Sequence, residues 1–163
     1  HAIPRRQRQM CIRDSMGSDL NTTAAPRFWV WATQDPTGTP LDRIQIIKGW
    51  VENGEQRQRV WDVVCSNGRK PNESGKCPAT TASVDLSSCQ RTGGEGAREL
   101  EVTFSDPDFS AEYPAFYYAR VLENPTCRWT TVLANSGNTE LPDDVPAIVQ
   151  ERGWSSPIWS ASR

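Results

Sequence analysis

The sequence predicts an all-β domain, an antiparallel β-sandwich with long loops and one short helix. Runs rich in aromatic and β-branched residues recur along the chain, and clusters of Gly, Pro, Asn and Ser separate them. An Asn-Gly pair joins the two longest runs, which is the strongest local signal for a hairpin. Several short strands joined by turns are typical of a sandwich.

The first half of the chain contains one strand and the hairpin. A strand is expected at 27–32 (Arg-Phe-Trp-Val-Trp-Ala), where bulky side chains point to both faces. Such a strand is either buried on both sides or packed under a neighbouring domain. The hairpin strands are expected at 41–51 and 57–65, on either side of Asn53-Gly54.

The second half begins with a loop that needs fastening, because a structureless stretch of this length is unusual in a compact domain. The strand after this loop alternates strictly, so Leu100, Val102 and Phe104 are expected to point inward. The strand expected at 115–122 ends before Pro125, because proline cannot donate a hydrogen bond to a neighbouring strand. The expected elements are a loop at 66–96 with a short strand at 83–86, strands at 99–104 and 115–122, a helix at 129–135 ended by Gly137, and a last edge strand at 156–159.

Length and charge restrict the function. The 163 residues make one domain, and 18 basic against 20 acidic residues give a net charge of −2. This balance excludes an electrostatically driven nucleic-acid binder. The sequence has no apolar run long enough for a membrane span, and mean hydropathy is −0.64.

Residues 1–15 differ from the rest of the chain. Four Arg against one Asp give them a charge of +3, so the remainder carries −5. The run 10–15 (Met-Cys-Ile-Arg-Asp-Ser) resembles the translation of a transposon-end adapter used in sequencing libraries. We expect 1–15 to be an artefactual arm of a metagenomic fragment, or else a disordered basic arm, and 16–163 to be the domain. Neither His1 nor Cys11 is then a candidate for chemistry.

Four further cysteines, Cys65, Cys77, Cys89 and Cys127, lie in or near the long loop and the strands around it. We expect two disulfides that pin this loop, and we favour Cys77–Cys89 with Cys65–Cys127, although sequence alone cannot choose among the three pairings that are available. Free buried thiols or a structural zinc site are the alternatives, but no C-x-x-C spacing occurs. Disulfides would indicate a periplasmic or secreted protein.

Catalytic constellations are mostly missing from the sequence. The one histidine is His1, so neither a Ser-His-Asp nor a Cys-His arrangement can be built in the domain, and we do not expect this chain alone to be an enzyme. Turn and cap roles are expected for Gly93–Gly96, for Asp106 with Asp108, and for Asp143 with Asp144, in preference to phosphate or calcium binding.

Aromatic and arginine side chains are the remaining candidates. Core packing is expected for most of the aromatic set, with a sugar-stacking platform as the alternative. Arg120 shares a strand face with Tyr118 and is expected in a buried ion pair with Glu151 or Glu123, or else to face a substrate. The same two alternatives, a structural ion pair or a cation that faces a substrate, apply to Arg128 and Arg152. The aromatic set is Trp29, Trp31, Trp50, Trp61, Tyr117, Tyr118, Trp129, Trp154 and Trp159.

Several segments together resemble a known family. The chain from residue 16 to about 160 is similar to the C-terminal part of the bacterial family called domain of unknown function 3604. The family pattern often has Ala where this chain has Gly153. The segments are 16–20 (Met-Gly-Ser-Asp-Leu), 26–32 (Pro-Arg-Phe-Trp-Val-Trp-Ala), 41–48 (Leu-Asp-Arg-Ile-Gln-Ile-Ile-Lys), 114–123 (Pro-Ala-Phe-Tyr-Tyr-Ala-Arg-Val-Leu-Glu), 128–131 (Arg-Trp-Thr-Thr) and 150–159 (Gln-Glu-Arg-Gly-Trp-Ser-Ser-Pro-Ile-Trp).

The resemblance implies a function for the parent protein. Full-length members look like exported proteins that are distantly similar to the polymerase-and-histidinol-phosphatase (PHP) metallohydrolases, with their metal-binding motifs in the N-terminal region. The resemblance therefore implies a noncatalytic C-terminal domain that packs on the N-terminal part of its own parent chain. It implies a divalent metal in the parent and no cofactor in this part. The alternative is an extracytoplasmic ligand- or carbohydrate-binding sandwich that uses exposed Trp.

Overall fold

The computed structural model describes residues 16–94 and 96–160, and its main sheet has six strands. The strand order is β1-β12-β8-β3-β4, and β11 also pairs with β8. All pairs are antiparallel except β1 with β12. The strands are β1 (Asp19–Leu20), β3 (Leu41–Glu52), β4 (Glu55–Cys65), β8 (Ala115–Glu123), β11 (Arg152–Trp154) and β12 (Ile158–Ser160).

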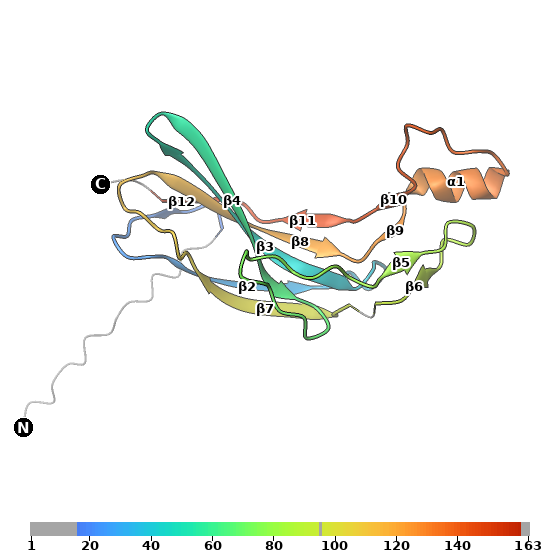
Figure 1. Ribbon diagram of the computed structural model, residues 1–163, viewed down its shortest axis with the longest axis horizontal. Coiled ribbons are helices and arrows are strands. Elements are labelled where there is room, and N and C mark those ends of the chain that lie inside the picture. The colour runs from blue at the N-terminus through green and yellow to red at the C-terminus, as the bar shows by residue number, and fades with distance from the viewer. Residues whose placement is uncertain (1–15, 95, 161–163) are drawn as a thin grey trace, which may run out of the picture.

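A two-stranded ribbon, β2 (Arg27–Thr33) with β7 (Glu99–Ser105), forms the second layer below the main sheet (Figure 1). Phe28 of the ribbon packs against Ile46, Trp61 and Tyr117 of the sheet. Leu100 of the ribbon packs against Leu41 and Ile44. The core therefore lies between two layers, and the predicted all-β sandwich is confirmed.

The hairpin is β3 and β4, and its turn has the predicted chemistry. Asn53 and Gly54 both have positive φ, 52° and 80°, which a tight hairpin turn requires. Glu52 pairs with Glu55 across this turn. A bulge between Ile44 and Gln45 then shifts the register before β4 reaches Cys65.

One end of the molecule carries smaller elements (Figure 1). The helix α1 (Trp129–Gly137) ends at Gly137 as predicted, and Asn138 follows in the left-handed conformation. In the described part of the chain, no helix is long and apolar enough to cross a membrane. Two ribbons lie near α1: β5 (Ser83–Val84) with β6 (Arg91–Thr92), and β9 (Thr126–Cys127) with β10 (Ile148–Val149).

Two strands differ from expectation. Of the two alternatives for the strand at 28–32, burial on both sides within this domain is wrong, because Trp29 and Trp31 remain 65% and 56% exposed. The strand expected at the edge, now β12, lies between β1 and β8. β1 was not predicted, since a two-residue strand has no periodic pattern to detect.

The disulfides join Cys65 to Cys77 and Cys89 to Cys127, so the preferred pairing was wrong although all four cysteines are used. The chain turns back directly after β4, and Asp62 N–H donates to Gly75 O at 2.8 Å. This turn brings Cys77 beside Cys65 and leaves Cys89 for Cys127. The first bond fastens the long loop to β4 of the main sheet and the second fastens it to the β9–β10 ribbon. The loop is thus fastened by disulfides as predicted, and this bonding is typical of an oxidising compartment.

Candidate functional site

The outer face of β2 is the first candidate surface. Strand alternation puts Phe28 in the core and turns Trp29 and Trp31 outward. Trp29 Nε1 donates a hydrogen bond to Glu101 Oε1 at 2.8 Å, which fixes that indole on the ribbon. We call Trp29 and Trp31 the tryptophan face. Two large exposed rings on one strand are a feature of contact surfaces rather than of ordinary solvent-facing strands.

The outer face of the main sheet is the second candidate surface, and it points away from the ribbon. Cross-strand partners share a face, so the pair Trp154–Arg120 and the pair Trp159–Phe116 project together with Tyr118. The Phe116 and Trp159 ring centroids lie 5.3 Å apart. Trp154 and Trp159 are 61% and 51% exposed. Core packing was therefore the wrong expectation for these two tryptophans.

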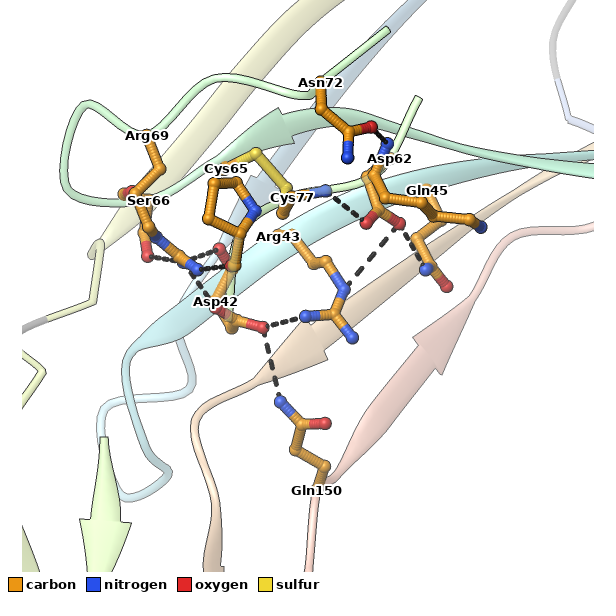
Figure 2. The surroundings of a disulfide bond; sticks show 12 residues. Asp42, Arg43, Gln45, Asp62, Cys65, Ser66, Arg69, Asn72, Cys77 and Gln150 are labelled. Atoms are coloured by element: carbon orange, nitrogen blue, oxygen red, sulfur yellow. Dashed lines mark hydrogen bonds and ion pairs between the residues drawn. A yellow bond between two sulfur atoms is a disulfide. The ribbon is translucent and has the colours of Figure 1, made fainter. Parts of the chain in front are cut away.

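A polar network continues from this surface toward the Cys65–Cys77 disulfide (Figure 2). Arg120 Nε donates to Gln45 Oε1 at 2.7 Å, and Gln45 Nε2 donates to Asp62 Oδ1. Asp62 Oδ2 accepts the Cys77 N–H at 2.7 Å. A cross-strand row from β11 to β4 thus ends on the disulfide.

A second buried carboxylate completes this network (Figure 2). Asp42 is fully buried and accepts from Arg43 at 2.6 Å and also from Arg69 and Gln150. Arg43 Nε also lies 3.7 Å from Asp62 Oδ1. Each buried carboxylate is thereby satisfied by cations and amides, as burial requires.

Arg120 was predicted to be buried in an ion pair, but its side chain is only half-buried. Its hydrogen-bond partner is the Gln45 amide, and in the described residues no ion pair joins it to Glu151 or Glu123. Glu123 instead accepts from the Thr39 N–H and hydroxyl, and Glu151 is exposed. The predicted pair fails because the β3–β8 register places Gln45, and no carboxylate, directly opposite Arg120.

The aspartates for which turn and cap roles were expected in preference to calcium binding have separate roles. Asp106 is buried and binds Lys48 Nζ at 2.6 Å and the Tyr117 hydroxyl at 2.7 Å. Burial, together with the hydrogen bond to Asp106 and its negative charge, raises the pKa of the Tyr117 phenol. Asp108 pairs with Arg59 at the surface, and Asp143 and Asp144 lie in an exposed turn.

An open groove of about 800 Å³ lies beside the Cys89–Cys127 disulfide. Glu123, Glu151 and Arg91 line it, together with Gly93 and Gly94. The glycines form a turn with positive φ, as predicted for this run. In residues 16–94 and 96–160, no group of three or more His, Cys, Asp or Glu side chains is placed to hold a metal ion.

Comparison with known protein families assigns the chain to one of them. The family model described as "Protein of unknown function (DUF3604)" matches residues 8–162. The chain belongs to this family. No curated protein and no solved structure is similar enough to match. The match confirms the family resemblance that the sequence segments between Met16 and Trp159 indicated. The arm expected at residues 1–15 lies outside the described part of the structure.

Two features of the candidate surfaces were missed by the sequence analysis. The exposed side of β2 could have been recognised, because strict alternation of Phe28 and Val30 with two tryptophans places the latter on the opposite face. Strand β11, which brings Trp154 beside Arg120, had no usable signal because it is three residues long and starts after a polar stretch.

Proposed function

We propose that this chain is a noncatalytic structural domain that packs on the metal-dependent, PHP-like hydrolase part of a larger family member. The tryptophan face carries the proposal. The sandwich core between the two layers is filled, yet Trp29 and Trp31 remain mostly exposed on the outer side of the ribbon. A domain boundary explains why such residues lie outside a complete core.

The energetics favour a protein contact at this face. Full burial of one large apolar side chain contributes roughly 1.5–3 kcal/mol, and tryptophan is over-represented among the residues that dominate interfaces. The Trp29 indole is already held by Glu101, so little side-chain entropy is lost when the ring is covered. The face therefore supports packing against the N-terminal part of the parent chain.

The divalent metal belongs, in this proposal, to that N-terminal part. The described residues offer no ligand cluster, so no chemical step is assigned to this chain. The two disulfides support export, and we propose that the parent is periplasmic or secreted.

Self-association of the isolated 163-residue chain tests the packing. We expect the chain to form concentration-dependent oligomers in light scattering and to bind a dye of apolar surfaces. The double variant Trp29→Ser/Trp31→Ser should be monomeric with much weaker dye binding. Trp129→Ser, which removes an equally exposed tryptophan on α1, is the matched control and should behave as the wild type. A wild-type chain that is monomeric and dye-negative at all concentrations contradicts the proposal.

The genomic sequence upstream of the Met16 codon tests the nature of the parent. We expect an open reading frame that encodes a Gly-Asp-Leu-His-x-His-like metal motif. An upstream region that encodes no His- and Asp-rich motif would exclude a metallohydrolase parent while leaving the packing proposal to the association experiment.

A further inference from the structure

The second candidate surface supports a role separate from packing, because it lies on the layer opposite the tryptophan face. We call six residues on the outer face of the main sheet the aromatic platform. They project from three neighbouring strands and share one face by register: Phe116, Tyr118 and Arg120 of β8, Arg152 and Trp154 of β11, and Trp159 of β12.

The rings of the platform are arranged in a row along β8. Phe116 stacks near-parallel to Tyr118, with an interplanar angle of 10° and centroids 6.3 Å apart, and Trp159 lies beside Phe116. Trp154 and Trp159 flank positions four residues apart on β8, which corresponds to about 13 Å along the strand. This length suits a chain of several rings better than a single small ligand.

The same face carries cationic groups without a protein partner. Arg120 uses Nε on Gln45, and no hydrogen bond or ion pair in the described part of the chain involves its terminal nitrogens or the Arg152 guanidinium. Asp62 and Asp42 are buried and bound to Gln45, Arg43 and Arg69. In the described residues, neither Glu123 nor Glu151 forms an ion pair with Arg120 or Arg152. A positive, aromatic surface has thus formed on a chain of net charge −2.

We propose that the aromatic platform binds an acidic oligosaccharide, with sugar rings stacked on Trp154 and Trp159 and uronate carboxylates paired with Arg120 and Arg152. Aromatic side chains offer a flat apolar face with a polar edge, which matches the alternating surface of a pyranose ring. The guanidinium fork matches a carboxylate in a bidentate geometry. Because the platform is positively charged, an acidic sugar should bind it more tightly than a neutral sugar.

Gel retardation of the full 163-residue chain tests this proposal. We expect polygalacturonate or alginate in the gel to retard the chain at low salt, and neutral dextran and polyglutamate to retard it much less. Trp154→Ala and Arg152→Gln should each weaken retardation by about tenfold, and salt should weaken the wild type further. Arg91→Gln and Trp29→Ala are the matched controls from other surfaces and should bind as the wild type.

Several outcomes would overturn the proposal. These are no retardation by either acidic polysaccharide, equal retardation by polyglutamate, and equal losses in Arg91→Gln and Arg152→Gln. If Trp154→Ala abolished self-association in light scattering, the platform would be a protein contact and not a sugar site. Circular dichroism checks the fold of each variant, and Trp159→Ala replaces Trp154→Ala if the latter does not fold. A failure in the polysaccharide gels alone leaves the packing proposal intact, because the variants that test packing lie on the other layer.

Discussion

Lys48 and Asp106 form an ion pair of 2.6 Å inside the sandwich, where their side chains are 5% and 0% exposed. Lys48 Nζ also donates to the Asp108 carbonyl at 2.8 Å and lies 5.0 Å from the Trp50 ring centroid. The pair joins the central strand β3 to the loop between β7 and β8. Because both charges are removed from water, each depends on the other for compensation.

Replacing Lys48 should therefore destabilise the fold strongly. Lys48→Met leaves the Asp106 carboxylate buried without its cation, and we expect the free energy of unfolding to fall by about 3–5 kcal/mol in urea titrations followed by tryptophan fluorescence. Arg57→Gln breaks the exposed pair with Glu55 and is the control, with an expected loss below about 1 kcal/mol. Equal losses in the two variants would contradict the role given to burial.

Tyr117 should make the fold sensitive to alkaline pH. The raised pKa means that the folded protein keeps the phenol proton above pH 10.0, the ordinary pKa, while the unfolded chain releases it. The stabilisation from this group is therefore complete below pH 10.0 and decreases as pH rises above it, by at most about 1.4 kcal/mol per pH unit.

Urea titrations at pH 8 and pH 11 measure this effect. Tyr117→Phe should be less stable at pH 8, by about 1 kcal/mol for the lost hydrogen bond, but should lose less stability than the wild type between the two pH values. Tyr118→Phe retains Tyr117 and should keep the wild-type pH dependence. If Tyr117→Phe also kept it, another group would be responsible.

The two disulfides should contribute unequally to stability. Cys89–Cys127 spans 38 residues and Cys65–Cys77 spans 12, so loop-closure entropy predicts losses of about 4 and about 3 kcal/mol when each pair is changed to Ser. Unfolding titrations of the two double variants compare the losses. Peptide mapping without reductant checks the connectivity, and a Cys77–Cys89 peptide would refute the observed pairing.

Gly49 should tolerate no side chain. A Cβ at this position would lie 2.3 Å from Phe116 Cζ, so Gly49→Ala should destabilise the sheet by about 1–3 kcal/mol. Gly153→Ala is the matched strand control because nothing lies within 4 Å of its Cβ position. Thermal melts compare the two, and adding Phe116→Leu to Gly49→Ala should recover part of the loss. A neutral Gly49→Ala would show that Phe116 moves aside without cost.

Part of the candidate surfaces was accessible from the sequence. The alternation in 27–32 and 99–104 identifies the inward residues Phe28 and Leu100, and the same period assigns Trp29 to the opposite face. The aromatic platform was not accessible, because it requires β11 and β12 to pair with β8 in one particular register. Register between distant strands depends on the packing of the whole sheet and on no local pattern.

The sequence by itself determined the all-β class, the Asn53-Gly54 hairpin, the helix near residue 130 and the use of four cysteines in disulfides. These follow from local chemistry: backbone conformations that a turn demands, side-chain period and cysteine count. Only the tertiary structure decided the Cys65–Cys77 and Cys89–Cys127 connectivity, the Gln45 partner of Arg120 and the aromatic platform. Each of these depends on residues far apart in the chain meeting in space, where strand register and layer packing select the contacts.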